Sequence, residues 1–195
     1  RQGRVIPLPT PAKQPFFFQA GSSRFLMPGG FFRGSGVITA VKAMKMLPEW
    51  AELVVWGPGQ DRSKDEIRRI IEEYRMAHRV TVAEDAPRGS FLAGLVPSLL
   101  PDPCHHAAGV LLANSIPALS TPSGCHRDLV RDGISGLYHS PGNKVQLAGQ
   151  MNHLLENSGL AEYLSTSAGE FHRKSFSTGM LGAMWTEAME QLTEK

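Results

Sequence analysis

The sequence predicts an α/β protein in which helices flank a single parallel sheet. Short apolar runs alternate along the chain with longer stretches whose apolar residues recur at helical spacing. A glycine-rich loop at 28–36 separates one such run from the helix expected after it. Two more turns, near 98–103 and 121–125, also join an apolar run to a helix. A repeated order of strand, loop and helix is typical of a parallel sheet.

Composition limits the class of protein further. The chain has 195 residues, 42% of them hydrophobic, which is enough for one good core and favours one domain. The 20 basic and 18 acidic residues nearly balance, so no electrostatic footprint for nucleic acid is present. There is no apolar run of 18 residues and no signal-like pattern, so we expect a soluble protein exposed to the cytoplasm. Two cysteines, Cys104 and Cys125, fit a reducing compartment.

Hydrophobic periodicity and turn residues place the expected elements. A further apolar run covers 16–19, and the stretch from 83 to 94 leaves little room for a helix. The expected core strands are 24–27, 52–56, 79–82, 95–98, 117–120 and 137–138. The expected helices are 37–47, one from 63, one from about 103, one after 124, then 144–157, 160–174 and 178–193.

Three of these loops predict an anion site. Asp102 suits an N-cap and Pro103 the first helical position. The turn at 121–124 exposes backbone before a helix that we expect near Cys125. In a parallel sheet such loops lie at the carboxyl ends of the strands, where ligands bind. Helix N-termini and glycine-rich backbone at that edge favour an anion, most often a phosphate.

The segment 97–136 resembles the donor-binding half of retaining, two-domain glycosyltransferases of the GT-B type, the group 1 or GT4-like family. Pro97-Ser98 matches the start of the family's pattern, and Asp102 stands as a shortened carboxylate at its first Glu. Val110 occupies the position of the second Glu, which in the family contacts the ribose. The remaining matches are Ser115-Ile116-Pro117-Ala118, Ser123-Gly124, Asp128, Val130, Gly133 and Gly136.

The resemblance implies a Rossmann-like parallel sheet, the C-terminal half of a GT-B fold, and assigns roles to individual residues. Asp102 would be the catalytic carboxylate that orients the donor sugar, and Arg33 would meet the diphosphate in place of the family's Arg/Lys pair. The expected donor-binding residues are Gly29, Gly30, Arg33, Ser35, Gly36, His105, His106, Ser123, Gly124 and Cys125. Simpler interpretations remain beside these, because Asp102 also suits a plain N-cap and the glycine loop a turn that starts a helix.

The cysteines and histidines near 104–106 and 125–126 also suggest a zinc site. Zinc needs four such ligands in fixed geometry, and no C-x-x-C or H-x-x-x-H unit occurs here. We therefore expect no metal and no cofactor, the nucleoside diphosphate sugar being the donor substrate. His105 or His106 is expected to donate hydrogen bonds to it.

The same resemblance divides the chain into a connector (1–15), a nucleotide-sugar-binding domain (16–177) and a C-terminal helix (178–195). Since the chain begins with Arg1, we expect a fragment that lacks the N-terminal acceptor domain. The implied reaction transfers a hexose to a glycan or lipid-linked acceptor in the cytoplasm, with peripheral association at the inner membrane face left open for the full-length protein. The alternatives are a degenerate, non-catalytic scaffolding module and a dehydrogenase, which ranks last because G-x-G-x-x-G is missing.

Overall fold

A computed structural model describes residues 14–29, 31–57, 63–101 and 106–193. Within these ranges the secondary structure follows the expected order. The strands are β1 (Phe16–Phe18), β2 (Arg24–Pro28), β3 (Glu52–Trp56), β4 (Val80–Val82), β5 (Gly89–Phe91), β6 (Ala93–Val96), β7 (Ala118–Ser120) and β8 (Gly136–Tyr138). The helices are α1 (Val37–Met44), α2 (Lys64–Glu73), α3 (His106–Ala113), α4 (His126–Leu129), α5 (Lys144–Glu156), α6 (Ser158–Ser175) and α7 (Thr178–Thr193).

Six strands form one fully parallel sheet in the order β4-β3-β2-β6-β7-β8. The first strand of this sheet along the chain, β2, thus lies in its middle, with β3 and β4 on one side and β6, β7 and β8 on the other. This is the doubly wound order of a Rossmann-like fold, in which the chain reverses its direction of progress between β2 and β6. The carboxyl end of that pair is where such folds bind ligands.

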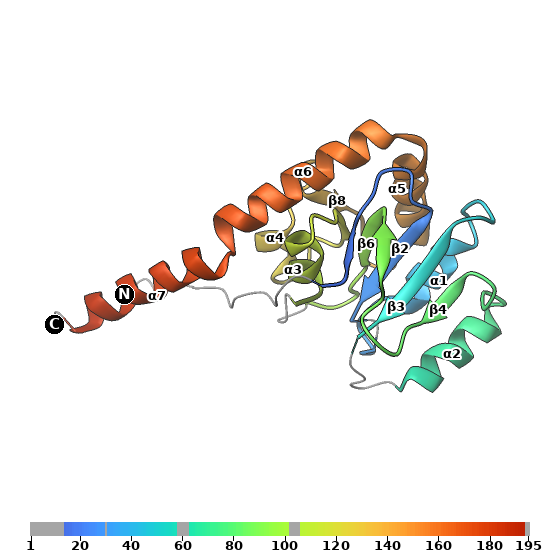
Figure 1. The fold of residues 1–195 in the computed structure, drawn as a ribbon. Helices are drawn as coiled ribbons and strands as arrows, with labels where there is room; N and C mark the ends of the chain where they lie inside the picture. Colours follow the sequence, from blue (N-terminus) through green and yellow to red (C-terminus); the bar gives the residue numbers. More distant parts are fainter. Residues whose placement is uncertain (1–13, 30, 58–62, 102–105, 194–195) are drawn as a thin grey trace.

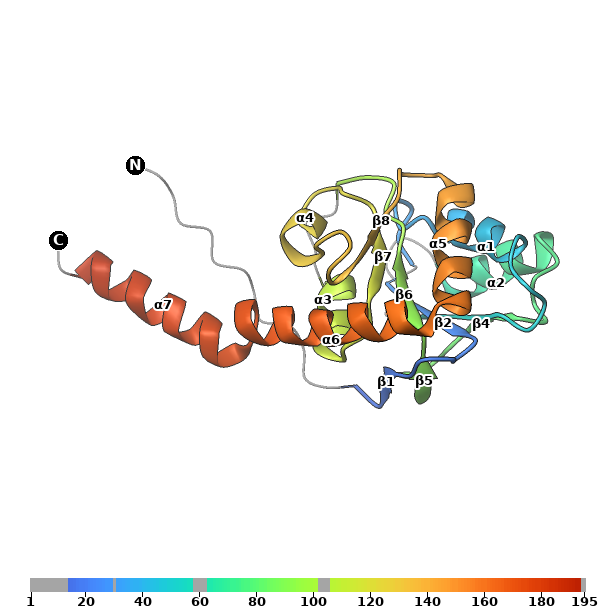
Figure 2. The ribbon, with the colours of Figure 1, turned by 90° about the horizontal axis from the view of Figure 1, so that it is seen from above.

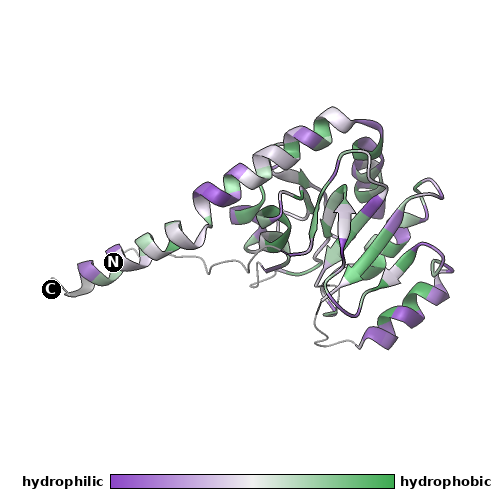
Figure 3. Cartoon of the chain, viewed as in Figure 1, coloured by the Kyte–Doolittle hydropathy of each residue, from purple (hydrophilic) through white to green (hydrophobic). Residues whose placement is uncertain are grey.

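Helices lie on both faces of the sheet (Figure 1), and the strands of the sheet are largely apolar (Figure 3). One cluster packs α1, α2 and α5 against one face, and a second packs α3 and α4 against the other. Because a parallel sheet is buried on both faces, its strands read as continuous apolar runs such as Leu53-Val54-Val55. The helix α6 contributes Ala161 and Leu164 to the first cluster and Ala168 to the second.

Side chains fix the ends of the helices that flank β3. Ser63 caps α2, its hydroxyl accepting a hydrogen bond from Glu66 N at 3.1 Å. Before β3, the buried Arg79 donates to the carbonyl of Met44, the last residue of α1, and to those of Leu47 and Pro48 in the segment that follows it. A cation at a helix C-terminus offsets the negative end of the helix dipole.

The apolar run at the start of the described chain forms a second, small sheet. β1 pairs in parallel with β5, with Phe16 opposite Gly89 and Phe18 opposite Phe91. Phe16 packs edge-on against Trp56 and Phe91, with ring centroids 5.7 and 6.0 Å apart. The stretch 83–94, expected to have little room for a helix, contains β5 and the start of β6 instead.

The two C-terminal helices differ in how much of the domain they contact. Figures 1 and 2 show α6 lying along the domain while α7 extends away from it. On α7 Leu181 is buried, whereas Met180, Trp185 and Met189 are 46%, 47% and 56% exposed. Over the described ranges, none of the helices combines the length and apolar character that crossing a bilayer would require.

Candidate functional site

The glycine-rich loop after β2 lies against the ends of two neighbouring strands. Gly29 has a φ of 76°, and its N–H donates to the carbonyl of Trp56 at the end of β3, 2.7 Å away. Gly36, with a φ of 75°, is the N-cap of α1. A Cβ atom at Gly36 would lie 1.9 Å from the carbonyl oxygen of Pro97, so the loop touches the backbone just after β6. Both the backbone conformation and this close approach require glycine at position 36.

The loop after β6 is bonded to loops on both sides. On the β2 side, Leu99 N–H donates to the carbonyl of Gly34 at 2.7 Å. On the β7 side, the hydroxyl of Thr121 donates to the carbonyl of Ser98 at 3.0 Å. Both Ser98 and Thr121 are buried. The three loops that follow β2, β6 and β7 are therefore joined to one another at the carboxyl edge of the sheet.

The start of α3 completes the arrangement. A Cβ atom built on Gly29 would lie 3.6 Å from Cβ of Ala107, so the glycine loop and the first turn of α3 are in van der Waals range. The convergence expected for the glycine loop, the start of the third helix and the 121–125 turn is thus present among the described residues. Pro103 and the catalytic candidate Asp102 lie outside them, as do Gly30 and His105.

The turn before α4 is held by backbone hydrogen bonds. Ser123 N–H donates to Thr121 O at 2.8 Å, His126 N–H donates to Ser123 O at 3.2 Å, and Gly124 has a φ of 56°. The helix that follows has only four residues, His126–Leu129. The expectation that the N-terminus of this helix favours an anion is therefore weakened, because a single turn sums few peptide dipoles. Because the Ser123 N–H is donated to Thr121 O, anion binding here would depend on the amide of Gly124.

The expected side chains differ in their access to solvent. Arg33 and His106 are exposed, Cys125 is partly exposed and Ser35 is buried. Sequence reasoning missed Arg127, which is exposed and donates from Nε to the carbonyl of Pro122 at 2.7 Å, beside the turn. A single arginine in a short helix does not by itself indicate a ligand-binding site in the sequence. Its relevance follows only from the position of α4.

Position 110 has no polar side chain to offer a ligand. Val110 is 6% exposed and packs in the apolar cluster of α3. Its carbonyl accepts a hydrogen bond from Nδ2 of Asn114 at 2.8 Å. At the position that the resemblance assigns to the second Glu, the structure thus has a buried apolar side chain.

Several buried polar side chains lie under the same edge of the sheet. Ser120 Oγ is 3.1 Å from Nδ1 of His126, and both residues are fully buried. His139, at the end of β8, is 3% exposed, and its Nδ1 lies 3.1 Å from the carbonyl of Ser140. Burial lowers the pKa of His139. Within the described ranges, no group of three or more His, Cys, Asp and Glu side chains is placed to hold a metal ion.

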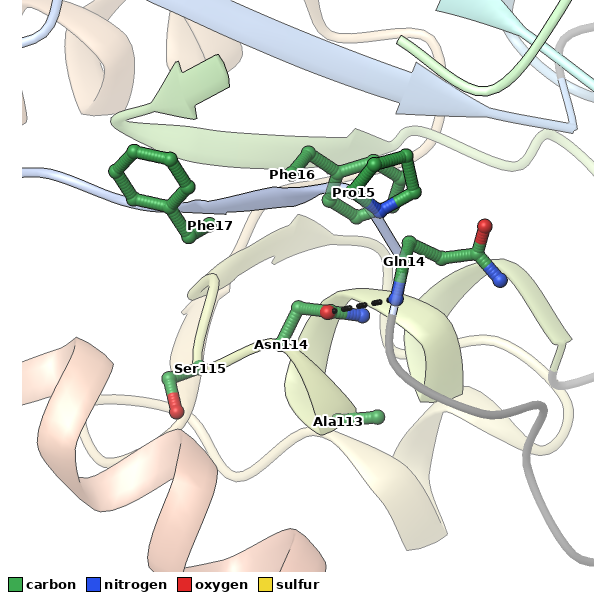
Figure 4. Close-up of a pocket in the computed structure, with 7 residues that line it drawn as sticks. All are labelled: Gln14, Pro15, Phe16, Phe17, Ala113, Asn114 and Ser115. Carbon is green, nitrogen blue, oxygen red and sulfur yellow. Dashed lines mark hydrogen bonds between the residues drawn. The ribbon is translucent and has the colours of Figure 1, made fainter. Parts of the chain in front are cut away.

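A pocket of about 360 Å³ lies elsewhere, at the far end of α3 (Figure 4). Its lining residues are Gln14, Pro15, Phe16, Phe17, Ala113, Asn114 and Ser115. Gln14 N–H donates to Oδ1 of Asn114 across it at 3.1 Å. Because α3 begins at the carboxyl edge of the sheet and ends at this pocket, the pocket is separate from the converging loops.

Solved structures with the same arrangement are glycosyltransferases. A sucrose-phosphate synthase from Thermosynechococcus elongatus matches with a TM-score of 0.81 and 23% identity, over 98% of this chain and 53% of the other. HepE from Anabaena, solved in complex with UDP, matches with a TM-score of 0.77 and 16% identity, over 88% and 50%. Neither a protein-family model nor a curated protein sequence matches the chain.

One match corresponds to a single domain. The C-terminal domain of LpcC, a group 1 family glycosyltransferase from Francisella tularensis, matches with a TM-score of 0.64 and 14% identity, over 87% of this chain and 89% of that one. The chain has the fold of a group 1 glycosyltransferase C-terminal domain. It spans about half the length of the sucrose-phosphate synthase and HepE chains.

Proposed function

We propose that this chain is the nucleotide-sugar-binding domain of a retaining, GT4-like glycosyltransferase. The observation that carries the proposal is the joining of the loops after β2, β6 and β7 at the switch point of the sheet. A GT-B-type fold shared with a protein that was solved with UDP supports the same conclusion. The reaction we infer transfers a hexose from a nucleoside diphosphate sugar to a glycan or lipid-linked acceptor.

The chemistry requires that the charge on the leaving diphosphate is offset. The amide of Gly124 in the turn before α4, and amides of the glycine loop other than those of Gly29 and Ser35, are suited to bind its oxygens. Arg33 and Arg127, both exposed near these loops, are the cations that we assign to it. We assign the orientation of the sugar to Asp102, and no metal or other cofactor enters this scheme.

We propose that a second domain, outside this chain, binds the acceptor and contacts α7. The exposed Met180, Trp185 and Met189 on that helix are apolar surface of the kind that an interdomain contact covers. Such an enzyme would work in the cytoplasm, and at the inner face of the membrane if its acceptor is lipid-linked.

A second candidate function is a non-catalytic scaffolding module of the same fold. The buried Val110, which leaves no carboxylate for a ribose, favours it. Ser35 stands where the family has a lysine, and it is buried as well. A scaffold would bind nucleotides weakly or not at all.

Calorimetry on the 195-residue chain with UDP, GDP and ADP separates the two candidates. The donor-domain proposal expects one of the three to bind with a dissociation constant well below the millimolar range. Arg33→Ala and Arg127→Ala should each weaken that binding about tenfold, because a charge-assisted hydrogen bond contributes about 1.5 kcal/mol or more.

Arg69→Ala is the matched control, since Arg69 is an exposed arginine on α2 and should leave affinity unchanged. Millimolar or undetectable binding of all three nucleotides would instead support the scaffold.

A further inference from the structure

The loops after β6 and β7 pack against polar side chains that solvent cannot reach. Ser98, Ser120, Thr121 and His126 are each at most 1% exposed. Burying hydroxyl and imidazole groups is unfavourable unless they are hydrogen-bonded, so such a group usually serves a specific geometry. Here Ser120 ends β7 and Thr121 follows it, Ser98 lies two residues after β6, and His126 begins α4.

Their hydrogen bonds connect the 121–125 turn to three strands. Ser120, the last residue of β7, places its hydroxyl 3.1 Å from Nδ1 of His126, the first residue of α4. Thr121 donates from its hydroxyl to Ser98 O after β6. From β8, the hydroxyl of Tyr138 donates to the carbonyl of His126 at 3.0 Å. The residues on both sides of the Ser123–Cys125 turn are thereby tied to the sheet.

The turn needs such support because α4 is short. Four helical residues provide little cooperative stability, since helix formation becomes favourable only over longer segments. The His126 ring, through Ser120, therefore anchors the point where the turn enters α4. Because His126 is fully buried, it acts through the backbone of the turn and does not touch a ligand.

We propose that Ser120 and His126 are positioning residues that hold the 121–125 turn, and with it the amide of Gly124, in the orientation needed to bind a nucleoside diphosphate. The ligand class rests on the proposed function, but the fixing of the turn does not. The pair forms one unit, so removing either partner releases the turn.

Two variants and a conservative replacement test this in the 195-residue chain. Ser120→Ala and His126→Leu should each lower affinity for UDP at least tenfold, or for whichever of UDP, GDP and ADP the wild type prefers. The double variant Ser120→Ala/His126→Leu should bind the nucleotide no more weakly than the weaker-binding of the two single variants. His126→Asn, whose amide can take the place of Nδ1, should stay within about threefold of the wild type.

Ser165→Ala is the matched control, because it also removes a buried hydroxyl that is hydrogen-bonded. Ser165 Oγ donates to the carbonyl of Ser115 at 2.7 Å, next to the pocket at the far end of α3. This variant should lower the melting temperature as Ser120→Ala does while leaving nucleotide affinity unchanged. Equal losses of nucleotide affinity in Ser120→Ala and Ser165→Ala, or no loss in either variant, would overturn the positioning role.

Amide exchange in the ligand-free protein tests the turn independently of any nucleotide. The His126 N–H, which donates to Ser123 O, should exchange at least tenfold faster in Ser120→Ala than in the wild type and in Ser165→Ala. Unchanged exchange would refute the inference. Failure of the wild type to bind any nucleotide, with faster exchange observed, would refute the proposed function and the ligand class while leaving the anchoring of the turn established.

Discussion

Ser115 has a backbone conformation that suits glycine better than serine. It follows α3 with a φ of 56°, in the left-handed region that often ends a helix. That conformation costs an L-residue about 1–2 kcal/mol, which glycine would not pay. Glycine is also more flexible in the unfolded chain, and this offsets part of the gain. Ser115→Gly should therefore raise the free energy of unfolding by about 0.5–1 kcal/mol, measured by urea denaturation.

Ser167→Gly is the same chemical change, but it should lower the free energy of unfolding. Ser167 lies within α6, where glycine is unfavourable in the helix interior. That variant should be less stable than the wild type. A loss of stability in Ser115→Gly as well would show that contacts of the serine side chain outweigh its backbone strain.

At the scale of elements, the packing of α3 on β6 depends on one glycine. A Cβ atom at Gly94 would lie 2.1, 2.3 and 2.7 Å from Cδ1, Cδ2 and Cγ of Leu111, whose side chain is fully buried. Gly94→Ala would push α3 away from the sheet, and overpacking of this kind costs about 1–3 kcal/mol. We expect a loss of about 2 kcal/mol in free energy of unfolding.

A double-mutant cycle identifies the cause. Leu111→Ala alone should cost about 2–5 kcal/mol, because it leaves a cavity. In that background Gly94→Ala should cost almost nothing, since the clashing atoms are gone. If the two losses simply add in urea denaturation, Gly94 and Leu111 do not oppose each other and the close packing is not the constraint.

The sequence predicted most elements because their signals are local. The strand Glu52–Trp56 contains the continuous apolar run Leu53–Trp56, and Thr178–Thr193 shows clear helical spacing, so both have the bounds expected for them. The pairing of β1 with β5 was not predicted, because three-residue strands about 70 positions apart leave no local pattern. The length of α4 was also not predicted. The helix ends at Leu129 because the buried Val130 adopts an extended conformation, and no local pattern indicates this.

At the scale of the whole molecule, the meeting of the loops could be predicted, but their connections could not. Topology alone brings the carboxyl ends of β2, β6 and β7 to one edge. The buried Ser120–His126 hydrogen bond and the place of Arg127 depend on side-chain positions around a one-turn helix. Residue spacing contains no information about those contacts. The roles given to the expected site residues stay predictions.

Two histidines, one buried and one half-buried, make the stability of the whole domain depend on pH. Burial lowers the pKa of His139 and also that of the half-buried His172 below the ordinary value for histidine. As pH falls, the unfolded chain therefore takes up protons at these positions before the folded chain does. Proton uptake by the unfolded state stabilises it, so the free energy of unfolding should decrease as pH drops below about 6.5.

His139→Leu should remove most of this dependence, because His139 is the more deeply buried of the two. Each buried neutral histidine contributes a slope of up to about 1.4 kcal/mol per pH unit between its unfolded and folded pKa. Urea denaturation at pH 7.5, 6.5 and 5.5 measures it. His153→Gln, on an exposed position of α5, is the control and should keep the wild-type dependence. An unchanged slope in His139→Leu would mean that the folded protein accepts a proton at His139 as readily as the unfolded chain.

The surface carboxylates do not obscure this test. The pKa of Glu84 is lowered by hydrogen bonds from Lys64 and Arg68, so its contribution to stability is present above the ordinary pKa of a glutamate. That contribution is lost only as pH falls through more acidic values, below the range in which histidines titrate. A decline between pH 7.5 and 5.5 that disappears in His139→Leu therefore identifies the buried imidazole beside the candidate site as its source.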